Sequence, residues 1–147
     1  MTMIESYLIH PTKKYNRSCP SSTIPLHGLD RLGAPMDIRN HRFYHRCTTT
    51  DIIDKLKSSL AEALELYPPV TGIVRANEQG ELYIDLDAKS SPGTPFLVEI
   101  KDTPYIGDTD DLSPRPLMLP PLSSTLAVKI TQVIKTQQLF FVIIYFF

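Results

Sequence analysis

Residues 51–72 read DIIDKLKSSLAEALELYPPVTG, and this stretch decides the fold. Apolar residues recur in it at helical spacing, which predicts one amphipathic helix over about 51–67. We expect Thr50 or Asp51 to accept the free backbone N–H groups at the helix start. Two prolines then end the helix, because proline has no N–H and disfavours helix in the residue before it. The predicted apolar stripe consists of Ile52, Ile53, Leu56, Leu60, Leu64 and Tyr67.

Strand patterns lie on both sides of this helix. Residues 5–11 (ESYLIHP), 41–47 (HRFYHRC) and 95–101 (PFLVEIK) have the aliphatic and aromatic content of strands. Residues 125–133 (TLAVKITQV) alternate apolar and polar side chains, which predicts a strand that is buried on one face only. Residues 71–87 predict a hairpin whose turn is built on Asn77 and Gly80. One helix among several strands indicates a single domain of the α/β (α+β) class.

Composition excludes some functions. The chain has 147 residues, 15 Lys/Arg and 16 Asp/Glu, so it lacks the basic surplus of a typical nucleic-acid binder. Basic residues and all four histidines gather in residues 1–46, whereas residues 77–111 are acidic. This asymmetry either steers an anionic ligand towards the front of the chain or reflects a solvated face. Cys19 and Cys47 have no metal or disulfide spacing, which predicts free thiols and a cytoplasmic location.

Residue chemistry alone predicts no catalytic set. His41 and His45 have the spacing of two ligands on a helix, but they lie in a strand pattern without a third ligand, so we predict no metal site. His27 is either a base or a solvated loop residue. Asp85 and Asp87 share one face of a strand, where they either form a carboxylate pair or face solvent.

The ordered segments resemble the front of an acyl-CoA-dependent acyltransferase of the BAHD and trichothecene acetyltransferase type. IPLHGLDRLG carries a Leu-x-x-x-Asp opening at Leu26, Leu29 and Asp30. The helix leads into Tyr-Pro-x-Val-x-Gly at 67–72, although Ile73 replaces the arginine that usually follows. PFLVEIKD and LAVKITQ match the next two strands, with Lys129 where the family has Gln. The resemblance runs from about residue 4 to residue 132.

This resemblance implies a fold and a set of site residues. The fold is the chloramphenicol-acetyltransferase-like α/β half-domain, a mixed sheet packed by the 51–67 helix and incomplete in this chain. Acceptor contacts partly come from the loop after the Leu-x-x-x-Asp opening, which suggests Met36, Asp37 and Ile38 as pocket residues, the alternative being an ordinary turn. The resemblance assigns structural roles to Asp30, Tyr67, Pro68 and Gly72.

Family members continue with an aromatic residue, Gly-Gly, a second apolar strand and then His-x-x-x-Asp-Gly, whose histidine is the general base. This chain contains no such motif, so we expect no catalytic residue in it and no activity from it alone. Acyl-CoA is the co-substrate and a small-molecule alcohol or amine the acceptor of the full-length family. No bound cofactor is predicted for this chain. The alternative is a non-catalytic fragment that binds a small molecule or a protein.

The last part of the chain departs from the family pattern. Residues 133–147 end in nine consecutive apolar residues, too few to span a membrane as a helix. We interpret this tail as translation of an unspliced intron after Gln132. The alternatives are a natural short isoform and a tail selected to bind a membrane or a partner. Strand 125–133 is expected to have an open edge that, with the tail, promotes self-association.

Overall fold

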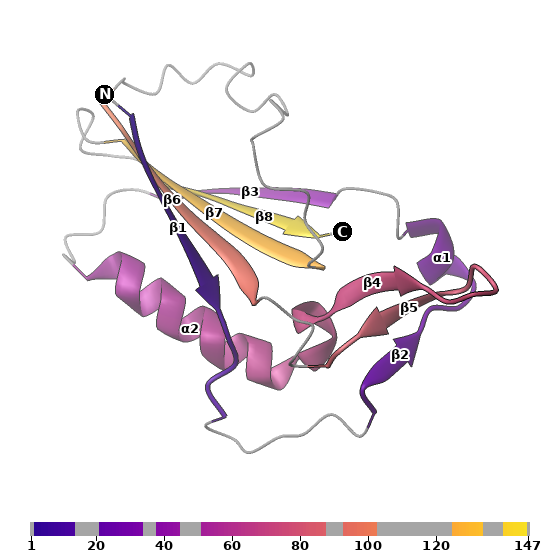
Figure 1. Cartoon of the computed structure of the whole chain (residues 1–147). Coiled ribbons are helices and arrows are strands. Elements are labelled where there is room, and N and C mark those ends of the chain that lie inside the picture. The colour runs from indigo at the N-terminus through magenta and orange to yellow at the C-terminus, as the bar shows by residue number, and fades with distance from the viewer. Residues whose placement is uncertain are drawn as a thin grey trace.

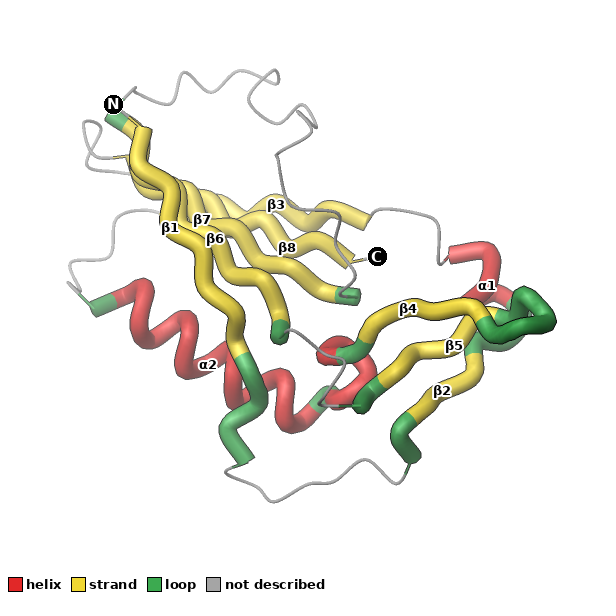
Figure 2. Tube along the Cα trace, viewed as in Figure 1, coloured by secondary structure: helices red, strands yellow, loops and turns green. Residues whose placement is uncertain are grey.

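The computed structural model describes residues 2–13, 21–33, 38–44, 51–87, 93–102, 125–133 and 140–146. Its strands form two sheets, one of five strands and one of three. Figure 1 shows a long helix lying along one face of the large sheet, with the small sheet beside the end of that helix. Figure 2 shows the same arrangement by element type. The predicted mixture of strands with one main helix is confirmed.

The large sheet has the order β1-β6-β7-β8-β3. Its strands are β1 (Thr2–Ile9), β3 (Ile38–Tyr44), β6 (Thr94–Lys101), β7 (Leu126–Val133) and β8 (Phe140–Phe146). β6 and β7 run parallel, and every other neighbouring pair runs antiparallel. The sheet is therefore mixed, as predicted. The parallel pair lies near its centre, where both faces can be covered.

The main helix α2 (Ile52–Leu66) forms at the predicted place. Its apolar residues pack against a cluster on β6 and β7 formed by Phe96, Val98, Val128 and Ile130. One detail of the prediction is wrong: Tyr67 lies past the helix end with 66% of its surface exposed. The 3-10 turn η1 (Pro68–Thr71) begins directly after Tyr67, so this residue is not part of the apolar face of α2. Of the two predicted capping residues, Asp51 makes no capping hydrogen bond, and Thr50 lies outside the described residues.

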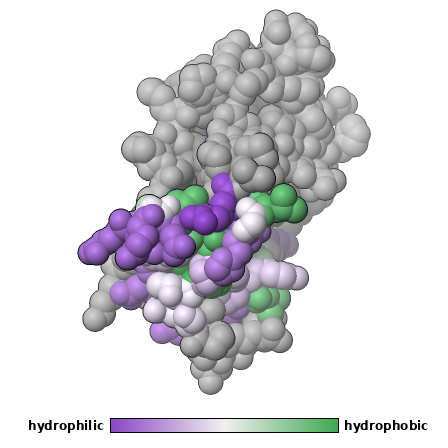
Figure 3. Space-filling view, turned by 90° about the vertical axis from the view of Figure 1, so that its right-hand side faces the viewer, coloured by the Kyte–Doolittle hydropathy of each residue, from purple (hydrophilic) through white to green (hydrophobic). Residues whose placement is uncertain are grey.

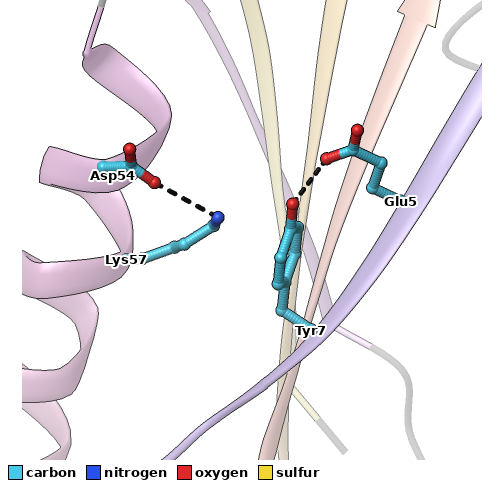
Figure 4. A network of polar contacts seen from close by, with 4 residues as sticks. All are labelled: Glu5, Tyr7, Asp54 and Lys57. Atoms are coloured by element: carbon cyan, nitrogen blue, oxygen red, sulfur yellow. Dashed lines mark hydrogen bonds and ion pairs between the residues drawn. The ribbon is translucent and has the colours of Figure 1, made fainter.

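A small polar network joins β1 to α2. The hydroxyl of Tyr7 donates to the Glu5 carboxylate at 2.5 Å, and the Lys57 ammonium lies 3.5 Å from the centre of the Tyr7 ring. Lys57 also pairs with Asp54 at 3.3 Å (Figure 4). A cation over an aromatic face is attracted by the ring quadrupole. The network thus helps to hold the edge strand against the helix.

The small sheet has the order β2-β5-β4. It consists of β2 (Thr23–Pro25), β4 (Ile73–Ala76) and β5 (Leu82–Asp85), and the short helix α1 (Leu29–Gly33) follows β2. The predicted hairpin joins β4 to β5. Asn77 accepts backbone hydrogen bonds from Gln79 and Glu81 at 3.0 and 2.7 Å, and Gly80 has φ +77°. The turn therefore uses the residues on which it was predicted.

Two predictions about β7 are wrong. Residues 126–131 are buried throughout, so this strand is not half-buried. It also has no open edge, because residues 140–146 of the tail form β8 and pair with it antiparallel. A strand with a neighbour on each side and both faces covered shows no one-sided pattern of burial. The uninterrupted apolar run of the tail is typical of such an interior strand.

Candidate functional site

Three strand ends meet at one end of the large sheet. Ile38, the first residue of β3, lies opposite Phe146, the last residue of β8. Phe146 also lies opposite Leu126, the first residue of β7. Figure 1 shows this end turned towards α1 and the small sheet. Of the predicted acceptor residues, Ile38 thus starts β3 here, whereas Met36 and Asp37 lie outside the described residues.

The turn after α2 is bound to the same end. The backbone N–H of Thr125, just before β7, donates to the carbonyl of Gly72 at 3.1 Å. Its hydroxyl donates to the carbonyl of Pro69 at 3.2 Å. These two bonds connect the Tyr-Pro-x-Val-x-Gly segment to the start of β7. They hold this turn at the start of β7.

Gly72 is required by close approach. Its φ of −85° suits any residue, but a Cβ there would overlap the Cγ2 of Ile84 and would lie 2.8 Å from the carbonyl oxygen of Asp85. The neighbouring Pro68 carbonyl accepts a hydrogen bond from the Thr71 hydroxyl at 2.7 Å. The tight turn therefore packs directly on β5.

Asp30 contacts its own loop. The backbone N–H of His27 donates to the Asp30 carboxylate at 3.5 Å, and the N–H of Asp30 donates back to the carbonyl of His27 at 3.0 Å. Leu26 is half-buried, whereas Leu29 is 82% exposed. These contacts support a loop-stabilising role for Asp30.

Among the other candidate residues that the structure describes, no catalytic group is brought together. His41 belongs to β3, whereas His45 and both cysteines lie outside the described residues. Asp85 does not face solvent as expected: only 16% of its side chain is exposed, and it pairs with Arg75 at 2.9 Å across the hairpin. Asp87 is exposed. No cluster of three or more metal-binding side chains occurs among the residues that the structure describes.

The sequence alone did not predict a buried ion pair that the structure shows on the large sheet. The ammonium of Lys129 lies 2.6 Å from the carboxylate of Glu99, and both side chains are less than one-tenth exposed. The Thr131 hydroxyl donates to the same carboxylate at 3.2 Å. Val128 and Ile130 pack towards α2, so the alternation of β7 directs Lys129 to the opposite face. In the register of β6 and β7, Glu99 lies opposite Thr131 rather than Lys129, so the ion pair is diagonal. The available signal was one charged residue, of opposite sign, in the interior of each of these two largely apolar strands.

A hollow of about 350 Å³ lies between α1 and the small sheet. His27, Arg31, Asn77 and Glu81 supply its polar lining. Pro25, Leu26, Leu82 and Tyr83 supply most of the rest. Figure 3 views this side of the molecule, where hydrophilic and hydrophobic residues lie next to one another. This hollow was not predicted, because its lining comes from segments more than 40 residues apart in the sequence.

Within the described part of the chain, no helix has both the length and the apolar composition needed to cross a bilayer.

Comparison with known proteins gives two findings and one negative result. The family model described as the Transferase family matches residues 1–132. The crystal structure of vinorine synthase superposes with a TM-score of 0.73 and 18% sequence identity, over 99% of this chain. The chain spans 38% of the length of vinorine synthase. A search of curated proteins found no match.

The two findings extend over different parts of the chain. The sequence match stops at residue 132, whereas the structural match covers 99% of the chain. The structural likeness confirms the chloramphenicol-acetyltransferase-like α/β fold. Because the family model covers most of its length, the chain belongs to the Transferase family, the BAHD acyltransferases.

Proposed function

We propose that this chain is the N-terminal portion of an acyltransferase that moves an acyl group from acyl-CoA to a hydroxyl or amine of a small molecule. The acceptor heteroatom attacks the thioester carbonyl, the C–S bond breaks, and an ester or amide forms with release of the CoA thiol. A general base takes the acceptor proton, a task that suits histidine. All four histidines of this chain precede residue 46, and the family motif His-x-x-x-Asp-Gly is not in it.

The meeting of strand ends carries this proposal. The family's histidine motif follows its second apolar strand, and in this chain the tail strand β8 takes the place beside β7 that we propose for that strand in the spliced protein. The end of β8 lies opposite the start of β3, directly after Met36 and Asp37 in the chain. The position of Ile38 at the start of β3 supports the proposal that this residue, together with Met36 and Asp37 before it in the sequence, contributes to the acceptor pocket.

The catalytic part of the proposal is tested by product release. The purified 147-residue chain, mixed with acetyl-CoA and a panel of small alcohols and amines, should release free CoA thiol no faster than buffer does. Release above that rate would contradict the inactivity that we propose. A family member of full length, assayed in parallel, shows that the assay detects turnover.

The origin of the tail is tested by sequencing transcripts across the codon for Val133. We expect a spliced message that joins Gln132 to an aromatic-Gly-Gly continuation and then to His-x-x-x-Asp-Gly. A message that reads only into the present tail would instead favour a non-catalytic binding module. The pairing of β8 with β7 and β3 favours that second reading, because it gives the tail a place in the sheet.

Location and assembly stay predictions. Two cysteines without disulfide spacing support a cytoplasmic protein. The folded chain does not expose the edge of β7 for self-association, because β8 pairs with that edge. The apolar tail still favours self-association of chains that have not folded, since such segments are prone to β-aggregation.

A further inference from the structure

The hollow between α1 and the small sheet has a guanidinium and an imidazole available for a ligand. His27 and Arg31 both line it, and both residues are exposed. Within the described residues, neither side chain makes a hydrogen bond or an ion pair. By contrast, Arg75 on the same sheet is paired with Asp85. The hollow therefore contains a positive guanidinium and an imidazole whose hydrogen-bonding capacity is not used by the described part of the protein.

The rest of the lining is largely apolar, with one acidic residue. Pro25, Leu26 and Tyr83 provide an apolar wall of the kind that holds the body of a small ligand. Glu81 lines the hollow from the hairpin, where its carboxylate accepts a hydrogen bond from the Asn77 side chain at 3.3 Å. A ligand thus meets an apolar wall, one guanidinium, one imidazole and one carboxylate that is hydrogen-bonded within the hairpin.

We propose that this hollow binds a small apolar carboxylate, with Arg31 as the main anchor of its carboxyl group. A guanidinium presents a planar pair of N–H groups that match the two oxygens of a carboxylate. The surplus of basic over acidic residues in 1–46 also favours a negatively charged ligand. The inference goes beyond the proposed function, because Ile38, Gly72 and Thr125 at the sheet end do not line the hollow.

Benzoate is a suitable probe, with benzyl alcohol as the matched uncharged ligand. Each is titrated into the ¹⁵N-labelled 147-residue chain at low salt, and backbone amide shifts are followed. A ligand of this size should bind with a Kd of about 1 mM. Benzyl alcohol should bind about tenfold more weakly, because it lacks the charge-assisted hydrogen bonds. Absence of benzoate binding, or equal binding of the two ligands, overturns the proposal.

Substitutions at two residues of the hollow should shift affinity in opposite directions. Arg31→Ala should weaken benzoate binding about tenfold, with Arg31→Lys intermediate because it keeps the charge but loses the planar fork. Glu81→Gln should strengthen binding by about threefold, because it removes a like charge. Lys55→Ala is the control, since Lys55 is an exposed cation on α2 outside the hollow.

Circular dichroism melts establish that each variant is folded before it is titrated. Unchanged affinity in Arg31→Ala would overturn the assignment of the anchor. A loss of affinity in Lys55→Ala equal to that in Arg31→Ala would show a general charge effect and would overturn the site. The outcome does not depend on acyl transfer, so it separates this inference from the proposed function.

Discussion

The two sheets differ in how they exclude water. In the large sheet, β6 and β7 are buried over residues 94–99 and 126–131. In the small sheet, Ile73 is the one buried strand residue among those described, and the rest are half-buried or exposed. The large sheet also joins segments far apart in sequence, such as β1 with β6. The small sheet is organised around a local hairpin. Changes in the large sheet should therefore cost more stability.

The largest effect should come from removing β8. Among the described strands, β3 pairs only with β8, so a chain that stops after Gln132 deprives β3 of its neighbour and uncovers an edge of β7. We expect this shorter chain to lose its cooperative thermal unfolding, measured by circular dichroism. Removal of Phe147 alone, which lies past β8, is the control. A sharp melt within a few degrees of the parent chain would show that β8 is dispensable.

Loss of the buried ion pair between Lys129 and Glu99 should have the next largest effect on stability. Lys129→Ala leaves the Glu99 carboxylate buried without its ammonium partner, so it should lower the free energy of unfolding by about 3 kcal/mol. The double variant Glu99→Leu with Lys129→Met should recover most of this loss, since apolar side chains of similar size often replace a buried pair well. Urea unfolding measures both. A double variant no more stable than Lys129→Ala would refute the charge-based explanation.

Substitution of two glycines next to the strands of the small sheet separates the stability cost of a steric overlap from that of a strained backbone. Gly72→Ala should cost about 2 kcal/mol, because the new Cβ meets the side chain of Ile84 and the backbone of Asp85. Gly80→Ala meets no atom within 4 Å but keeps a positive φ, so it should cost about 1 kcal/mol. Urea unfolding of both variants gives the order. A larger loss at Gly80 would mean that the turn, rather than the close approach, limits stability.

The smallest effect should come from the ion pair of the small sheet. Arg75 is 45% exposed, so solvent screens its attraction to Asp85. Arg75→Ala should lower the free energy of unfolding by about 0.5 kcal/mol, and added salt should reduce the difference. The same urea experiment, repeated at low and high salt, checks this. A loss as large as that of Lys129→Ala would remove the proposed contrast between the two sheets.

The sequence by itself determined the elements whose signals are local. The periodicity of residues 51–67 predicted α2 to within one residue at each end, because side chains on one helix face come from a continuous segment. Asn77 and Gly80 predicted the hairpin turn, because positive φ and side-chain capping act over a few residues. The ordered motifs also identified the family, which the family model confirms.

Only the tertiary structure decided which distant segments meet. It inserts β8 between β7 and β3, pairs Lys129 with Glu99, and joins Thr125 to Gly72. It also brings together the separate segments that line the hollow beside Arg31. An apolar segment has the same local pattern whether it binds a membrane, aggregates or forms an interior strand. The segments that pack against it decide among these outcomes. Strand neighbours and register arise from contacts between residues far apart in the chain, which local periodicity does not encode.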